Sequence, residues 1–111
     1  MKLYIAGPMK DWPDGNRPAF KKARALLENE GYEVISPVDI IKVDSGGKLD
    51  FPKTFHADLT VVCLEADGVV VLPGWETSDG ASIEAMTARR VGKPVWELSV
   101  ILLYGTEGKT L

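Results

Sequence analysis

The sequence predicts an α/β fold: a doubly wound parallel sheet of four to five strands in a three-layer sandwich of the Rossmann or flavodoxin-like kind. Short apolar runs alternate with amphipathic segments along the chain, and turns rich in Gly and Pro separate them. The run Gly68 to Leu72 is continuously apolar and β-branched at its centre, which is typical of a strand covered on both faces. The chain has 111 residues and no linker or repeat, so we expect one domain over residues 1–111.

Four segments have the composition of buried strands. Each is short and apolar, and glycine, proline or polar residues flank it. These segments are residues 3–6, 32–36, 68–72 and 94–96. The apolar tail at 99–104 suits a fifth strand, a short helix or a contact between copies of the chain.

The segments between these strands predict three helices. Phe20, Ala23 and Leu27 repeat at helical spacing, Asn16 can cap this helix, and Gly31 ends it. A second helix begins near Pro52, and a third spans residues 80–91. The apolar face of the second helix comprises Phe55, Leu59, Val62, Cys63 and Ala66.

Residues 37–52 form the longest segment without a periodic pattern. They are mostly polar and contain Gly46-Gly47. We expect an irregular, mobile excursion with a functional role, because long loops inside small domains usually have one.

Composition narrows the classes of partner. The chain is 45% hydrophobic and 26% charged with a net charge of −3, which argues against general binding to nucleic acids. No apolar run approaches the roughly 20 residues of a membrane span, and the N-terminus is too short in apolar residues for a signal peptide. The single cysteine, Cys63, reads as a core residue. We therefore expect a soluble cytoplasmic protein without membrane partners.

Two acidic residues stand out by position. Asp58 lies between Phe55 and Val62 on the apolar face of the second helix, where an isolated carboxylate costs free energy unless it is paired or functional. Glu84 lies in the early turns of the third helix, where free N–H groups favour anions. Asp58 also suits an acid at the margin of the apolar face, and Glu84 suits a simple partner of the helix dipole.

Three motifs stand in order along the chain: Tyr4-Ile5-Ala6-Gly7-Pro8, His56-Ala57-Asp58-Leu59, and Ser78-Asp79-Gly80 followed by Glu84 and Ala88. In this arrangement residues 3–95 resemble the nucleoside 2-deoxyribosyltransferase superfamily, which includes the 2′-deoxynucleoside 5′-phosphate N-hydrolases. The segments YIAGPM and LPGWETSDGASIEAMTA are similar to a short phage and bacterial branch of that superfamily.

The resemblance implies roles for the two acids. Glu84 matches the nucleophilic glutamate that attacks the anomeric carbon, and Asp58 matches the acid that assists departure of the base. This is the two-carboxylate chemistry of retaining glycosidases, in which burial raises the pKa of the general acid.

The resemblance also implies substrate contacts in residues 73–80, the third of the three loops (7–17, 36–52 and 73–80) that follow predicted strands. Ser78 matches the serine that contacts a 5′-phosphate in the monophosphate hydrolases, and Gly80 keeps the backbone close. Asp79 could instead hold a sugar hydroxyl, as a nearby acid does in the transferases. These two alternatives imply opposite charge preferences in the ligand, and Ser78 also suits a plain helix N-cap.

Other candidates lie in the first loop, residues 7–17, and in the third loop. Gly7 and Pro8 match the family loop that lies under the sugar and base. Lys10 and Arg17 could meet a phosphate or stay solvated. Trp12 and Trp75 could stack on a nucleobase or pack on a neighbouring loop or subunit.

The leading hypothesis is cleavage of the N-glycosidic bond of a (deoxy)nucleoside, with hydrolysis of a 5′-monophosphate slightly preferred over deoxyribosyl transfer between bases. Alternatives are a non-catalytic nucleotide-binding or sequestering module and a protein-interaction role. We expect no cofactor and no metal, because the chain has one histidine, one cysteine and no phosphate-binding glycine motif. The resemblance also implies a homodimer or higher oligomer, in which a polar residue such as Ser99 or Tyr104 completes a neighbour's site.

Overall fold

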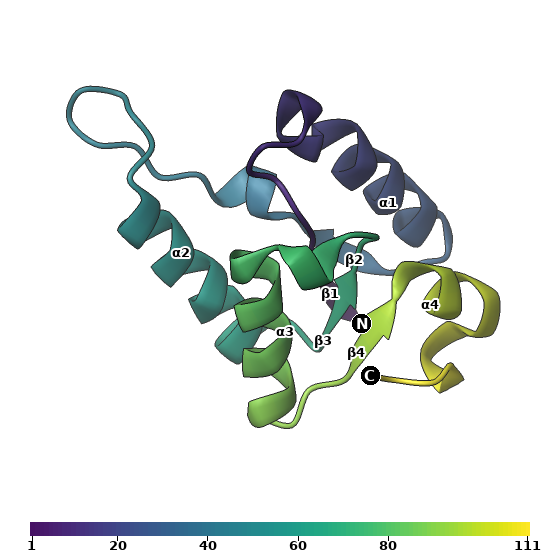
Figure 1. The fold of residues 1–111 in the computed structure, drawn as a ribbon. Helices are drawn as coiled ribbons and strands as arrows, with labels where there is room; N and C mark the ends of the chain where they lie inside the picture. Colours follow the sequence, from purple (N-terminus) through teal and green to yellow (C-terminus); the bar gives the residue numbers. More distant parts are fainter.

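A parallel sheet of four strands forms the middle layer of the computed structural model, which describes residues 1–111 (Figure 1). Its order is β2-β1-β3-β4, and every neighbouring pair is parallel. The strands are β1 (Lys2–Ala6), β2 (Glu33–Ile35), β3 (Gly68–Val71) and β4 (Val95–Glu97). The predicted α/β class and doubly wound parallel sheet are thus confirmed, with four strands.

Helices cover both faces of the sheet. The helices α2 (Phe51–Thr60) and α3 (Asp79–Arg90) lie together on one face, and α1 (Arg17–Asn29) and α4 (Leu98–Tyr104) lie on the other (Figure 1). Helix α2 continues into a π-helical turn, Val61–Glu65. Because chain connections leave β1 and β3 toward opposite sides of the sheet, the gap beyond their carboxyl ends is the place where this fold binds ligands.

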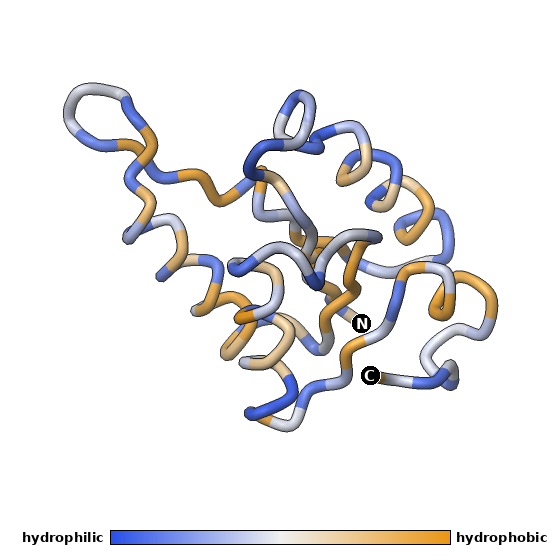
Figure 2. Tube along the Cα trace, viewed as in Figure 1, coloured by the Kyte–Doolittle hydropathy of each residue, from blue (hydrophilic) through white to orange (hydrophobic).

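Alternating side chains of the central strands form two hydrophobic clusters. Tyr4 and Ala6 face α2 and α3, whereas Leu3 and Ile5 face α1 and α4. These four residues of β1 are 0% exposed. Figure 2 shows hydrophobic colour along the inner strands, and also on parts of the helices and of segment 37–52. Strand β1 is therefore closely packed on both faces, so residues that its side chains contact are held in fixed positions.

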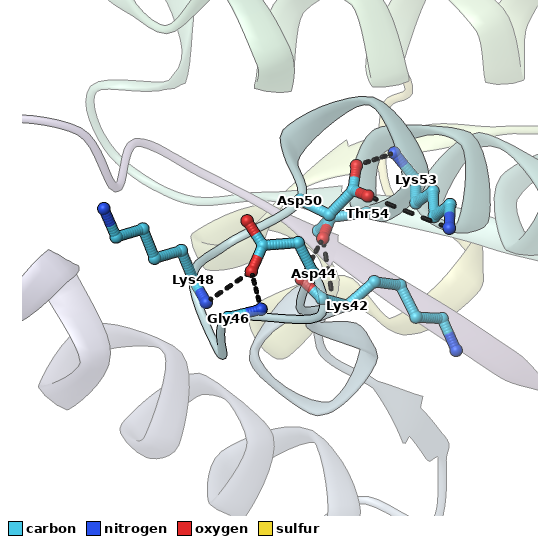
Figure 3. Close-up of polar contacts among 7 residues, drawn as sticks. All are labelled: Lys42, Asp44, Gly46, Lys48, Asp50, Lys53 and Thr54. Atoms are coloured by element: carbon cyan, nitrogen blue, oxygen red, sulfur yellow. Dashed lines mark hydrogen bonds and ion pairs between the residues drawn. The ribbon is translucent and has the colours of Figure 1, made fainter.

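The segment 37–52 is irregular over most of its length, as predicted, but local hydrogen bonds give it a defined shape. It begins with a 3₁₀ turn, Pro37–Ile40, and then projects as a narrow loop closed by an antiparallel bridge between Val43 and Leu49 (Figure 1). The Asp44 carboxylate accepts hydrogen bonds from the backbone N–H groups of Gly46 (2.8 Å) and Lys48 (3.0 Å) (Figure 3). A short polar side chain that bonds to nearby backbone replaces regular structure here.

The N-cap of α2 follows directly. The Asp50 carboxylate accepts a hydrogen bond from the Lys53 N–H at 3.1 Å (Figure 3). The Thr54 hydroxyl accepts a hydrogen bond from the Lys42 N–H at 2.9 Å. These bonds join the base of the projecting loop to the first turn of the helix.

The predicted N-cap position at Asn16 is confirmed, but the capping hydrogen bond is not made. Asn16 occupies the N-cap position of α1 with a φ of 62°, and its side chain makes no capping bond. Its Nδ2 instead donates to the Pro8 carbonyl at 2.9 Å. Left-handed backbone at this position directs the amide back to the first loop, where Asp11 and Asp14 also have positive φ.

The apolar tail forms a short helix, α4, and no fifth strand. Ile101 is buried against the sheet, while Leu103 and Tyr104 are exposed. None of the helices is both long enough and apolar enough to cross a bilayer.

Candidate active site

An open cavity of about 710 Å³ lies beyond the carboxyl ends of β1 and β3. Its walls come from the first loop, the cavity-facing side of α2, the loop before α3 and the first turns of α3. A volume of this size suits a nucleoside-sized molecule. The structure brings these sequence-predicted residues to the cavity: Gly7, Pro8, Trp12, Asp58, Ser78, Asp79, Gly80 and Glu84.

Two predicted binding residues lie elsewhere. Arg17 begins α1 and lines a separate groove with Ser36 and Asp39. Trp75 packs against the hydrophobic cluster beneath α2 and α3 and lines a different groove between α1 and α4. The structure therefore does not bring Arg17 or Trp75 to the cavity. The chain turns at Gly74, where φ is 89°, before it reaches Trp75.

Glu84 is hydrogen-bonded to a side chain of the central strand β1. Its carboxyl group is on the buried side of α3, with only 5% of the residue exposed. The Tyr4 hydroxyl donates a hydrogen bond to Glu84 Oε2 at 2.6 Å. Sequence reasoning missed Tyr4 as part of the site. The signal was available, because a tyrosine inside a fully buried strand needs a polar partner for its hydroxyl.

Asp58 reaches the cavity from the neighbouring helix α2. It is 6% exposed, and its Oδ1 atom is buried without a hydrogen-bond partner in the protein. Asp58 is more buried than Leu59, so the predicted apolar face of this helix is rotated toward the carboxyl group. An unsatisfied buried carboxyl oxygen is costly unless a ligand or a proton meets it.

Two aromatic rings share this face of α2 with Asp58. Phe51 and Phe55 precede Asp58 by seven and three residues and also line the cavity. Their ring centroids lie 5.7 Å apart in a stacked arrangement. Sequence reasoning did not identify them as binding residues, although the spacing i, i+4, i+7 places such side chains on one helix face. The cavity thus has an aromatic wall next to a carboxyl group.

The two buried carboxyl groups have unusual proton affinities. Burial raises the pKa of Glu84 to about 8; the hydrogen bond from Tyr4 opposes this rise, and the charge of Asp58 adds to it. Burial likewise raises the pKa of Asp58 to about 7. Burial and the two nearby carboxylates raise the pKa of Tyr4 far above its usual range, so its hydroxyl remains a donor. Near neutral pH the two carboxyl groups therefore retain a proton between them.

The loop before α3 provides the opposite wall. Ser78 is the N-cap of α3, and its hydroxyl oxygen accepts a hydrogen bond from the Ala81 N–H at 3.2 Å. The hydroxyl proton of Ser78 stays available to a ligand. Asp79 and Gly80 follow in the first turn, and a Cβ at Gly80 would lie 3.9 Å from Phe55. This contact distance shows how closely α3 approaches the aromatic wall of α2.

Two glycines permit the loops to meet. A Cβ at Gly7 would lie 2.9 Å from Leu72 Cβ, so only glycine lets the first loop pass this close to the end of β3. A Cβ at Gly74 would lie 2.8 Å from Trp12 Cζ2. Trp12 therefore rests on the third loop and closes one side of the cavity.

The charges at the cavity are mainly negative. Lys10 is the single cationic side chain among the lining residues, which include four acids: Asp11, Asp58, Asp79 and Glu84. No group of three or more His, Cys, Asp or Glu side chains is arranged to hold a metal ion. A polar but uncharged ligand suits this lining better than a dianion does.

Comparison with known proteins places the chain in a family. Residues 1–97 match the model of a domain of unknown function, DUF4406. The chain belongs to this family. No curated protein matches it significantly.

Two solved structures share the fold. The first is described as a 2-deoxyribosyltransferase from the psychrotolerant bacterium Bacillus psychrosaccharolyticus, with a TM-score of 0.69 and 25% identity, covering 87% of this chain and 71% of the other. The second is described as a 2-desoxiribosyltransferase from Leishmania mexicana, with a TM-score of 0.57 and 20% identity, covering 97% of this chain and 73% of the other. The deoxyribosyltransferase-like fold expected from the sequence is thus confirmed.

The raised carboxyl pKa values predict how stability depends on pH. Between the ordinary pKa values near 4 and the folded-state values of about 7 and 8, only the folded state keeps these protons, so stability falls as pH rises. Glu84→Gln and Asp58→Asn remove the effect of one group each. We expect each variant to gain stability over the wild type between pH 4 and pH 8, on the order of 1–3 kcal/mol.

Urea unfolding followed by circular dichroism at several pH values measures this difference. Glu76→Gln, in the exposed loop before α3, is the matched control and should track the wild type at every pH. A stability difference for Glu84→Gln or Asp58→Asn that stays constant with pH would contradict the raised pKa values.

Proposed function

We propose that this protein cleaves the N-glycosidic bond of a nucleoside through a glycosyl ester on Glu84, with Asp58 as general acid and base. One observation carries the proposal: two buried carboxyl groups from adjacent helices border one cavity, and a buried tyrosine donates to one of them. The fold shared with a 2-deoxyribosyltransferase at 25% identity supports a sugar-transfer chemistry.

In the first step, a Glu84 carboxylate oxygen attacks the anomeric carbon C1′ of the sugar. The new bond is the C1′–O ester bond, and the C1′–N bond to the base breaks with its electron pair moving to the base. The proton of the Asp58 carboxyl group goes to the departing base nitrogen. Both carboxyl groups are then used as retaining glycosidases use theirs.

In the second step, an acceptor attacks C1′ of the glycosyl ester. The Asp58 carboxylate takes a proton from the acceptor, and the ester electron pair returns to Glu84. Water as acceptor gives hydrolysis, and a second base gives deoxyribosyl transfer. The same two residues therefore serve both reactions, and access of water to the ester decides between them.

The site has to place its proton on Asp58 and keep Glu84 ionised. The Tyr4 hydroxyl donates to Glu84 Oε2 and stabilises the carboxylate form of this group against the effect of burial. Positive charge that develops at C1′ favours the same form. In the free protein the pKa of Glu84 (about 8) exceeds that of Asp58 (about 7), so the proton lies mainly on Glu84 and has to move to Asp58 when the substrate binds. Asp58 Oδ1 is buried without a donor, which leaves that oxygen free to take the proton.

The aromatic wall supplies a place for the base. Phe51 and Phe55 stack along α2 one and two turns before Asp58, and Trp12 borders the cavity from the first loop. Base stacking on aromatic rings is favourable for any base. A base held there would place its glycosidic nitrogen toward Asp58.

The lining charges support an unphosphorylated nucleoside over a 5′-monophosphate, which reverses the preference drawn from Ser78 in the sequence. The Ser78 hydroxyl still has a proton to donate, but the Asp79 carboxylate lies beside it. Lys10 is the single lining cation, whereas Asp11 and Asp79 are acidic and the Asp58–Glu84 pair, which retains a proton, adds further negative charge. The Asp79 carboxylate suits a sugar hydroxyl as hydrogen-bond donor, whereas a phosphate dianion at this place would be repelled.

We further propose that residues 1–111 act as a single deoxyribosyltransferase-like domain within a cytoplasmic homo-oligomer. Leu103 and Tyr104 on α4 and Met86 on α3 expose apolar surface that a second copy could cover. The unpaired thiol of Cys63 is compatible with a reducing compartment.

The nucleophile is tested with Glu84→Gln. We expect release of free base from a panel of deoxyribonucleosides and ribonucleosides to fall about a thousandfold or more, because the amide cannot form the ester. Chromatography of the free base measures the rate. Glu76→Gln is the matched control and should retain wild-type turnover.

Asp58→Asn separates the two carboxyl roles in the same assay. The variant should lose activity on ordinary nucleosides. It should keep activity on a deoxyriboside with a nitrophenolate leaving group, because this group departs without a proton. Wild-type turnover in Glu84→Gln would refute the proposed chemistry. Tight nucleoside binding by the wild type, with no base released over long incubation, would favour the sequestering module instead.

The charge of the preferred substrate is tested by pairing each nucleoside with its 5′-monophosphate. The wild type should process the nucleoside with a kcat/KM about tenfold or more above that of the monophosphate, since close carboxylates repel the dianion. Asp79→Asn should lower this ratio, because it should raise the kcat/KM for the monophosphate. A monophosphate preferred by the wild type would show instead that Ser78 and Lys10 form a phosphate subsite.

A further inference from the structure

The end of helix α2 departs from α-helical hydrogen bonding one turn beyond Asp58. The Ala66 N–H donates to the Val61 carbonyl at 2.8 Å, five residues back, which closes a π turn. The Asp67 N–H donates to the Lys2 carbonyl of β1 at 2.7 Å. In a regular α-helix these two N–H groups would serve the carbonyls of Val62 and Cys63. Both carbonyls therefore lose their helical partners.

The ammonium group of Lys93 takes the place of these partners. Lys93 Nζ donates to the Val62 carbonyl at 2.9 Å and to the Cys63 carbonyl at 2.8 Å. A cation at the C-terminal end of a helix also interacts favourably with the helix dipole. The Lys93 backbone N–H donates to the Ala88 carbonyl at 2.8 Å, near the end of α3. One residue thus joins the ends of both helices that carry the carboxyl groups.

The positions of these contacts mirror each other. Val62 follows Asp58 by four residues, and Ala88 follows Glu84 by four residues. Each contact lies about 6 Å along its helix from the carboxyl-bearing residue, close to one turn. A shift or rotation of either helix end is therefore transmitted over a single turn to Asp58 or to Glu84.

We propose that Lys93 is a positioning residue that holds α2 in its π-turned register against α3 and so sets the spacing of Asp58 and Glu84. The proposal rests on the function proposed above for these two residues. Without the ammonium group, the Val62 and Cys63 carbonyls would be left without donors. Helix α2 could then regain them by reverting to an α turn, which rotates the helix by about 100° per residue of register.

The experiment compares Lys93→Met, which removes the donors, with Lys93→Arg, which keeps a cationic donor. Lys109→Met is the matched control, since Lys109 is exposed and makes no side-chain hydrogen bond. Carbon-13 NMR of the labelled carboxyl groups gives the titrations of Asp58 and Glu84 without any turnover. Amide hydrogen exchange at Ala66 reports whether the π turn persists, and nucleoside cleavage gives kcat and KM.

For Lys93→Met we expect faster exchange at Ala66, displaced titrations of Asp58 and Glu84, and a kcat lowered about 10- to 100-fold with a nearly unchanged KM. Lys93→Arg should recover most of each property, and Lys109→Met should behave as the wild type. A general loss of folding would instead move all amides together. If Lys93→Met does not fold, Lys93→Gln, which keeps a shorter neutral donor, is carried through the same measurements.

A folded Lys93→Met with wild-type exchange, titrations and kcat would overturn the positioning role. Its failure is distinguishable from failure of the proposed function. Suppose that the wild type cleaves no nucleoside, while Lys93→Met still shifts both titrations and speeds exchange at Ala66. The positioning role is then supported, and the proposed cleavage reaction is refuted. If the wild type cleaves nucleosides but Lys93→Met changes nothing, the chemistry stands and the positioning role falls.

Discussion

The hydrogen bond from the Tyr4 hydroxyl to the Glu84 carboxylate connects the most rigid part of the fold to the proposed reaction centre. Tyr4 pairs with Ile35 on one side and Val69 on the other, so neighbouring strands fix its backbone from both sides. Its side chain is fully buried beneath α3. A donor held this firmly needs no reorganisation when negative charge returns to the carboxylate as the glycosyl ester breaks, which is how preorganised groups stabilise reacting charge.

The remaining parts of the site follow from what surrounds that bond. Burial of Glu84 and Asp58 raises both pKa values. The hydrogen bond from Tyr4 opposes this rise at Glu84 alone. Gly7 lets the first loop approach the end of β3, and the Asn16 amide holds this loop through the Pro8 carbonyl. These two contacts therefore fix the first loop beside the cavity that the two carboxyl groups border.

Sequence patterns predicted the parts of the structure that repeat. The apolar run at β3 and the glycine and proline punctuation indicated the parallel sheet, and the spacing around Asp58 indicated an acid on an apolar helix face. The π turn at residues 61–65 and the left-handed backbone at Asn16 occur together with hydrogen bonds from Lys93 to the Val62 carbonyl and from Asn16 to the Pro8 carbonyl, which no local sequence pattern contains. Trp75 matched a binding aromatic by position, but the third loop turns it toward the core cluster instead.

In the proposed reaction, Glu84 becomes covalently attached to the sugar. Mass spectrometry of protein quenched during turnover with a 2′-fluoro-2′-deoxynucleoside tests this attachment. The fluorine on the sugar slows loss of the sugar from the ester. The account predicts a sugar adduct on the protein that maps to the peptide containing Glu84 and disappears when an acceptor base is added. Base release without any adduct, giving a sugar of inverted anomeric configuration, would contradict it.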